Sequence, residues 1–180
     1  MYWQNLDKKM NSLRRCMDMG DYAKARPLYE QLQAEYRSQS DWATEYEAIG
    51  GELAEIYAAM VVETNSQQEI PAAIDQLLAS AGGAYHGFLV ARLHWQAKRH
   101  LQALGVLEEI CQLSWHQGKP IIPPENDFWQ ASPGEKGIIL NLLGQGYKYF
   151  GMAQQAAQCY RLASEAAVYF PVKTSNYSNY

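Results

Sequence analysis

The amino-acid sequence predicts an all-α fold of about four antiparallel helix pairs. Apolar residues recur at three- and four-residue spacing along most of the chain, and the alternation typical of strands is missing. Residues that end helices, mostly glycine, asparagine, serine and proline, fall at intervals that divide the chain into short helices. A recurring order of small and large residues also relates one helix pair to another.

The first helix pair is expected over about residues 3–38. The run Met19-Gly20-Asp21 separates an opening helix from a second helix that reaches about Arg37, because glycine suits the backbone of a tight turn. Pro27 lies inside the second helix and removes one helical hydrogen bond. We therefore expect a bend at this proline or a later helix start.

The second pair is expected over about residues 41–81, with a long first helix that ends before Thr64-Asn65-Ser66. Two signals then place the start of its second helix one turn apart. Ser66 with Glu69 has the spacing of a capping box, whereas Pro71 is favoured in the first turn of a helix. The sequence leaves this boundary open between the two positions.

The last two pairs are separated by the one long loop of the chain. The third pair covers about residues 84–116, the loop 116–132 and the fourth pair 133–170, followed by a polar and aromatic tail over 172–180. Prolines and a glycine exclude regular α-helix from the loop, so the preceding helix is expected to end near Trp115. The run Ser132-Pro133-Gly134-Glu135 then restarts the helix with a serine cap and a proline in the first turn.

Composition and charge disfavour several classes of function. The formal net charge is −4, and no basic block typical of nucleic-acid binding is present. No apolar run approaches the ~20 residues that cross a bilayer, and the N-terminus lacks the order of a secretory signal. Cys16, Cys111 and Cys159 are far apart, which favours buried free thiols in a reducing compartment. We expect a cytoplasmic protein without nucleic-acid or membrane partners.

The sequence predicts no catalytic residues, no metal site and no cofactor. Four residues could suggest zinc binding: His86, His94, His100 and Cys111. No two of the histidines have the four-residue spacing of a zinc-binding helix, so structural roles are favoured. Cys111 and His116 do not define a catalytic dyad, because Glu108-Glu109 beside the cysteine would oppose a thiolate. We therefore expect a protein that is not an enzyme.

The clearest repeat lies in the final helix pair. Its small residues are Gly144, Ala156 and Ala163, and its large residues are Leu143, Tyr147 and Tyr160. Small residues at a helix crossing allow the axes to approach to the usual ~8–10 Å. Weaker copies of this order occur in the first pair (Gly20, Ala25, Tyr29) and in the third (Val90, Ala91, His94, Ala103, Leu107). At these residues the chain resembles the tetratricopeptide repeat family.

This resemblance implies a right-handed superhelical array, or α-solenoid, over residues 1–171. Its concave face would be lined by the first helix of each pair and would bind a peptide or a partner helix. The residues that the family pattern places on this face are Met10, Arg14, Met17, Phe88, Arg92, Trp95, Asn141, Gln145 and Lys148. Guanidinium and amide groups suit a peptide backbone or a carboxylate. The alternative is that these are ordinary exposed helix residues.

Three functional hypotheses follow. The first is an adaptor that binds a protein or peptide and has no chemistry of its own. The second rests on the tail, where Tyr169-Phe170-Pro171 precedes a repeated Ser-Asn-Tyr. This tail resembles the junction in bacterial relatives of O-linked N-acetylglucosamine transferase, which implies a non-catalytic repeat segment of a larger glycosyltransferase. The third is a structural module that associates with itself as a homo-oligomer.

The long loop has two interpretations. It carries five large apolar residues: Trp115, Ile121, Ile122, Phe128 and Trp129. They could form a lid or a contact patch, because long loops in compact repeats are often functional. The favoured alternative is a satellite core, in which the aromatic rings pack against the neighbouring helices.

Overall fold

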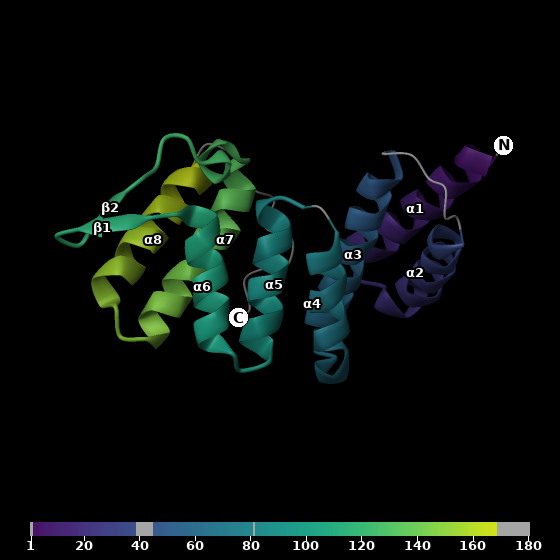
Figure 1. Ribbon diagram of the computed structural model, residues 1–180, viewed down its shortest axis with the longest axis horizontal. Helices are drawn as coiled ribbons and strands as arrows, with labels where there is room; N and C mark the ends of the chain where they lie inside the picture. Colours follow the sequence, from purple (N-terminus) through teal and green to yellow (C-terminus); the bar gives the residue numbers. More distant parts are fainter. Residues whose placement is uncertain (1, 39–44, 81, 169–180) are drawn as a thin grey trace. The chain divides into compact units, whose positions relative to one another are not determined.

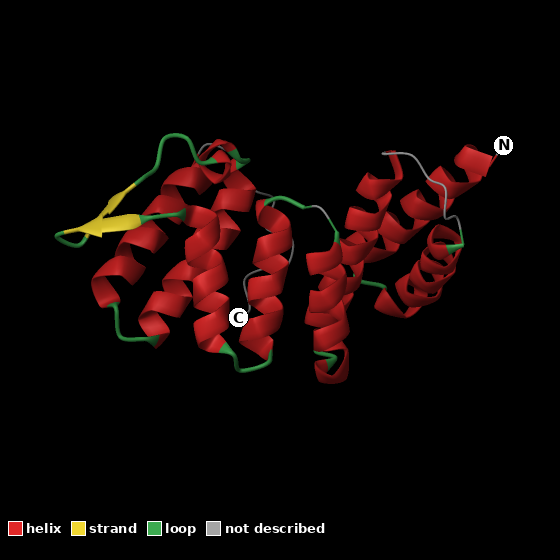
Figure 2. Cartoon of the chain, viewed as in Figure 1, coloured by secondary structure: helices red, strands yellow, loops and turns green. Residues whose placement is uncertain are grey.

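The computed structural model describes residues 2–38, 45–80 and 82–168 (Figure 1). The described part is mostly α-helical, as predicted, and is drawn by secondary structure in Figure 2. Its α-helices are α1 (Tyr2–Asp18), α2 (Tyr22–Arg37), α3 (Glu45–Glu63), α4 (Ile70–Ala79), α5 (Ala84–Gln96), α6 (His100–Cys111), α7 (Pro133–Tyr149) and α8 (Ala153–Val168). The chain divides into two compact units, Met1–Lys98 and Arg99–Tyr180, which are treated one at a time.

In the first unit, α1 and α2 form the predicted first pair. The Asp21 carboxylate caps α2 by accepting a hydrogen bond from the Lys24 backbone N–H at 3.2 Å. The helix begins at Tyr22 with Pro27 in its interior, so a later helix start at the proline is wrong. Pro27 is the sixth residue of α2, beyond the first turn, so its missing N–H removes one helical hydrogen bond, as the sequence indicates. The predicted start of the long helix near residue 41 lies outside the described residues.

The boundary that the sequence left open between α3 and α4 contains a short 3-10 helix, η1 (Gln67–Glu69). Pro71 is the second residue of α4, as its preference predicts. The Ser66 side chain makes no capping hydrogen bond, so the capping box is wrong. The reason is visible in other contacts: Ser66 Oγ lies 2.8 Å from Thr64 Oγ1, and the Glu69 carboxylate binds Arg26.

A similar turn follows four helices in the described part of the chain. Each of α1, α3, α5 and α7 is followed by a residue in the left-handed region: Gly20, Asn65, Lys98 and Gly151. At the first turn the Gly20 N–H donates to the Met17 carbonyl at 3.0 Å, and the Asp21 N–H donates to Cys16 at 2.9 Å. These bonds satisfy carbonyls that a helix end leaves without partners.

The core of the first unit lies where α5 packs on α3 and α4, and where α1 packs on α2. Its most buried side chains are Leu13, Leu32, Leu53, Met60, Ile70, Leu77 and Leu93. Helix α3 is the most enclosed element, because it contacts α2, α4 and α5. Figure 1 shows it beside α1, α2 and α4 in the first unit.

In the second unit, α7 and α8 cross at the small residues that the sequence selected. A Cβ atom on Gly144 would lie 2.7 Å from the Tyr160 ring, so only glycine fits this position without a shift. Ala156 and Ala163 are 4% and 3% exposed. On the other face of α7, a Cβ on Gly146 would lie 3.1 Å from Leu104 of α6. The predicted small-residue packing is therefore confirmed for this pair.

The loop after α6 differs from the expected one. Helix α6 ends at Cys111, four residues before the predicted Trp115, because Gln112 adopts a left-handed backbone with φ 47°. A two-stranded antiparallel sheet follows, β1 (Ser114–His116) and β2 (Lys119–Ile121), in which Trp115 pairs with Pro120. Gln117 and Gly118 both have positive φ, as a two-residue hairpin turn requires. A second 3-10 helix, η2 (Asp127–Gln130), leads into α7.

Candidate functional site

Among the predicted contact residues of α1, Arg14 forms a bond to a neighbouring helix. Its Nη2 donates to Glu52 Oε2 of α3 at 2.7 Å, and its Nη1 donates to Asn11 Oδ1 at 2.8 Å. The Arg14 side chain is exposed, and Met17 is half-buried. Met10 is 2% exposed and belongs to the core, so the interpretation of Met10 as a surface residue is wrong. Arg14 thus ties the first helices of the first two pairs together at the surface.

The predicted residues of α5 form a stacked set. The Arg92 guanidinium carbon lies 5.9 Å from the centre of the Phe88 ring, a distance suited to a cation–π contact. Phe88 is 8% exposed, so it supports the Arg92 side chain from within the unit. Trp95 and Arg92 are half-buried. The three residues therefore offer a positively charged and partly aromatic stretch along one helix.

Asn141, Gln145 and Lys148 are exposed on α7 in the second unit. They recur at four and three residues, so they lie along one stripe of that helix. Without Met10, the grouping of the other eight predicted residues into one groove remains a prediction.

Within the first unit, one stripe of α3 lies partly exposed between core residues, and Ile49, Gly50 and Glu55 of the same helix are partly exposed as well. Glu52, Ile56, Ala59 and Glu63 follow one another at three or four residues and are all half-buried, while most other described residues of α3 are buried. We call this stripe, together with Arg14 of α1 and Arg92 of α5, the first-helix face. It carries opposite charges around a short apolar centre.

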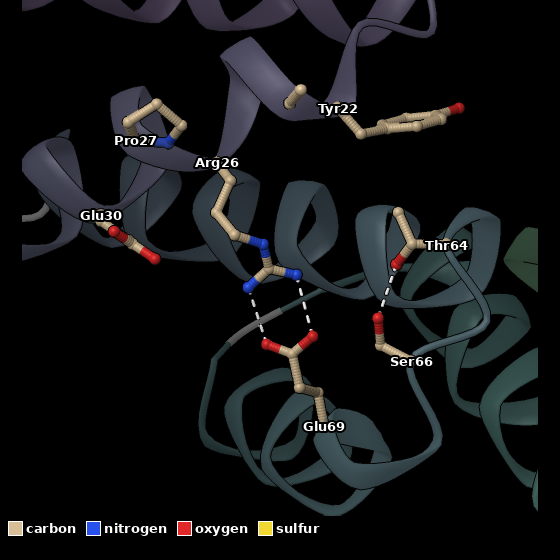
Figure 3. Close-up of a pocket in the computed structure, with 8 residues that line it drawn as sticks. Tyr22, Arg26, Pro27, Glu30, Thr64, Ser66 and Glu69 are labelled. Atoms are coloured by element: carbon tan, nitrogen blue, oxygen red, sulfur yellow. Dashed lines mark hydrogen bonds and ion pairs between the residues drawn. The ribbon is translucent and has the colours of Figure 1, made fainter.

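A hollow of about 490 Å³ lies between α2 and the turn that joins α3 to α4 (Figure 3). It is lined by Tyr22, Ala23, Arg26, Pro27, Glu30, Thr64, Ser66 and Glu69. Arg26 binds the Glu69 carboxylate through two hydrogen bonds of 2.7 and 2.9 Å, drawn as dashed lines in Figure 3. The Tyr57 hydroxyl donates a third bond to Glu69 at 3.2 Å. The Arg26 hydrogen bonds hold the pKa of Glu69 below its usual value.

Arg26 and Glu69 in this hollow already satisfy one another. Arg26 and Glu69 face each other in the two-pronged geometry that carboxylates and guanidinium groups prefer. The Thr64 hydroxyl donates to the Met60 carbonyl at 2.7 Å, which closes the end of α3. The hollow is therefore a polar junction that fastens α2 to the α3–α4 turn, and its ion pair has a structural role.

One arrangement was missed by sequence reasoning. The buried imidazole of His86, 7% exposed, lies between residues of two other helices. Its Nδ1–H donates to Glu55 Oε1 of α3 at 2.6 Å, and its Nε2 lies 3.0 Å from the Ser80 hydroxyl oxygen at the end of α4. The three residues come from different helices and span 31 positions, so no local spacing could reveal them.

The aromatic residues of the loop pack inward. Trp115 Nε1 donates to the Tyr147 hydroxyl at 3.2 Å, and Trp129 Nε1 donates to the Cys111 carbonyl at 3.0 Å. Phe128 is 3% exposed. The satellite-core interpretation is thus confirmed for the rings. The two isoleucines differ, since Ile121 is 52% and Ile122 is 41% exposed.

Two of the cysteines are buried as expected. Cys111 and Cys159 have no exposed surface, whereas Cys16 is half-buried. Burial raises the pKa of Cys159 to about 12 and raises that of Cys111 further, so both are neutral thiols near pH 7. The described residues contain no group of three or more side chains suited to hold a metal ion. No helix among them is long and apolar enough to cross a bilayer.

Comparisons with known proteins add no relative. No family model matches the chain, and neither the curated proteins nor the solved structures contain a match.

Proposed function

We propose that the protein binds a peptide or a helix of a partner protein on its first-helix face, as a tetratricopeptide-like array of helix pairs would. The observation that carries this proposal is the arrangement of α3. Glu52, Ile56, Ala59 and Glu63 of this helix remain partly exposed, Glu52 is bonded to Arg14 of α1, and α5, which carries Arg92, packs on α3. A surface built from the first helices of successive pairs is where such arrays bind their partners.

The charges on this face suit an elongated partner. Arg14 is fixed by its two bonds to Glu52, and Arg92 is supported by Phe88, so both side chains keep a defined place before a partner arrives. Fixed side chains lose little conformational entropy on binding. The half-buried Ile56 and Ala59 of α3 offer apolar contact area. The face thus combines a short apolar centre with charged edges, as protein interfaces commonly do.

The test is site-specific photo-crosslinking followed by affinity measurement. A photo-reactive amino acid placed at Ala59 should capture the partner from cells of the source organism, whereas the same group at Ala34, exposed on α2, should not. The captured partner is then purified and its Kd measured by calorimetry. Arg92→Ala should weaken binding roughly 5- to 30-fold, the effect of losing an arginine anchor.

Lys148→Ala extends the test to the second unit. Arg92→Ala and Lys148→Ala together should weaken binding, and each variant should keep the thermal stability of the wild type. An unchanged Kd for Arg92→Ala, or equal crosslinking from Ala34 and Ala59, would contradict the proposal.

A further inference from the structure

Three side chains of the first unit have the connectivity of a nucleophile, a base and an orienting acid. Ser80 Oγ lies 3.0 Å from His86 Nε2, and Glu55 Oε1 lies 2.6 Å from His86 Nδ1. A hydroxyl and a carboxylate on opposite nitrogens of one imidazole form the arrangement by which serine hydrolases activate their nucleophile. We propose that Ser80, His86 and Glu55 hydrolyse a carboxylic ester, an activity independent of partner binding.

The position of the proton on His86 follows from its neighbours. A carboxylate only accepts hydrogen bonds, so the Glu55 contact places a proton on Nδ1 of the neutral ring. Nε2 then carries a lone pair, which the Ser80 hydroxyl satisfies by donating to it. The Ser80 oxygen also lies 3.1 Å from the carbonyls of Gln76 and Leu77, and turning its proton to either would leave two lone pairs facing each other. In a buried setting that arrangement is unfavourable.

The backbone around the triad keeps the ring in place. Ser80 follows the last residue of α4 with an extended backbone, and His86 lies in the first turn of α5. Gly82 lies between them, and a Cβ atom there would be 2.0 Å from Cγ of the His86 ring. Only glycine allows the imidazole to occupy this site, so the sequence of the α4–α5 connection is matched to the position of the histidine.

Ser80 borders a hollow of about 450 Å³ that could hold a small substrate. The hollow is lined by Gln33, Tyr36, Arg37, Gly50, Ala54, Gln76, Ala79 and Ser80. Gln76 lies one helical turn before Ser80, and its Oε1 accepts a bond from Tyr29 at 2.8 Å. Its amide nitrogen still carries two N–H donors. With Gln33 and Arg37, it supplies hydrogen-bond donors for the negative oxygen that forms during attack on an ester.

The chemistry balances with water as the only other reactant. Ser80 Oγ attacks the ester carbonyl carbon, and its proton passes to His86 Nε2, which leaves an imidazolium beside the Glu55 carboxylate. The carbon–oxygen bond to the alcohol then breaks, and the alcohol leaves with the proton from Nε2. Water next attacks the acyl-serine, its proton passing through His86 to Ser80 Oγ, and the carboxylic acid is released.

The experiment uses the full chain and two probes, para-nitrophenyl acetate and a fluorophosphonate. The fluorophosphonate should label Ser80 alone, with loss of fluoride, and mass spectrometry of peptides locates the adduct. Ser80→Ala should abolish labelling and reduce ester hydrolysis to the rate of the buffer. The matched control is Ser38→Ala, because Ser38 also follows a helix end and bonds to a helix carbonyl at 2.8 Å. It should retain the full rate.

Variants of His86 and Glu55 should lower the rate of ester hydrolysis by different amounts. His86→Gln should lower hydrolysis by about 100-fold, the usual contribution of a general base. Glu55→Gln should lower it at least about tenfold. Thermal melts show whether each variant is folded, and Ser80→Ala removes only one oxygen from the fold. Absence of labelling at Ser80 in the wild type, or hydrolysis by Ser80→Ala at the wild-type rate, would overturn the proposal. Neither result bears on partner binding, which involves other residues.

Discussion

Each of the two units is stabilised internally by a different kind of interaction. In the first unit, polar side chains join helices that are far apart in sequence: Arg14 to Glu52, Arg26 to Glu69, Tyr29 to Gln76 and His86 to Glu55. In the second unit, α7 and α8 meet through Gly144, Ala156 and Ala163 with almost no polar contact between them. Ion pairs and hydrogen bonds thus join the helices of the first unit, whereas α7 and α8 meet mainly by close packing, with a polar link from Tyr147 of α7 to Glu108 of α6.

This difference predicts which changes each unit tolerates. Close packing fails when volume is added, because a filled interior has no room for extra atoms. Exposed or half-exposed ion pairs each contribute little, because water already solvates the separate charges. The stability of the second unit should therefore depend strongly on the size of a residue at the helix crossing, whereas the stability of the first unit should change slightly with pH.

The largest effect is expected from Ala156→Leu in α8. Ala156 is 4% exposed at the α7–α8 crossing, so a leucine there must push the helices apart. Unfolding free energy should fall by about 1–3 kcal/mol, measured by urea denaturation. The control is Ala157→Leu, at the next and exposed position of the same helix, where the change should be within about 0.5 kcal/mol. Equal losses of unfolding free energy for Ala156→Leu and Ala157→Leu would contradict the close packing of α7 against α8 at Ala156.

A smaller effect that depends on pH is expected from Glu69→Gln in the first unit. The folded-state pKa of Glu69 is lowered, chiefly by its hydrogen bonds to Arg26, so ionised Glu69 stabilises the fold. This contribution is fully present above the unfolded pKa and is lost as the pH falls through the folded pKa. At pH 7 the variant should be less stable by about 0.5–1 kcal/mol.

Melting temperatures measured over a series of pH values show whether the charge of Glu69 is responsible. Once the pH falls below the lowered folded-state pKa of Glu69, the melting temperatures of wild type and Glu69→Gln should converge, because the carboxyl is then protonated in the folded and the unfolded state. Glu165→Gln is the matched control, since Glu165 pairs with Arg161 on the exposed surface of α8 at 2.5 Å. Its effect should be no more than about 0.5 kcal/mol at either pH. If the melting temperatures of wild type and Glu69→Gln still differ by the same amount at low pH, the shape of the side chain, and not its charge, causes the loss of stability.

The same contrast explains how much the sequence could predict. Small residues, caps and turns act locally, so Gly20, Asp21, Ser132 and the α7–α8 crossing were recognisable from spacing alone. The Arg26–Glu69 pair joins residues 43 positions apart, and no period in the sequence indicates such a partner. The candidate triad was missed for this reason. The hairpin at Gln117-Gly118 did carry a local signal, because glycine readily adopts the positive φ that a two-residue hairpin turn requires.

Four similar turns between helices can also be compared, because different residues adopt the positive φ in them. Gly20 and Gly151 adopt positive φ freely, whereas Lys98 does so at φ 62° and Asn65 at φ 52°. A side chain with a Cβ atom costs about 1–2 kcal/mol in this conformation, although asparagine tolerates it better than lysine. The Lys98 turn therefore holds strain that the glycine turns lack.

Lys98→Gly should relieve this strain and stabilise the first unit, even though it removes a side chain. Glycine also makes the unfolded chain more flexible, which offsets part of the gain. The net increase in unfolding free energy should be about 0.5 kcal/mol, and Asn65→Gly should change it less, because asparagine already accepts the conformation. Urea denaturation of both variants measures the difference. A Lys98→Gly variant less stable than the wild type would show that the lysine side chain contributes more than its backbone costs.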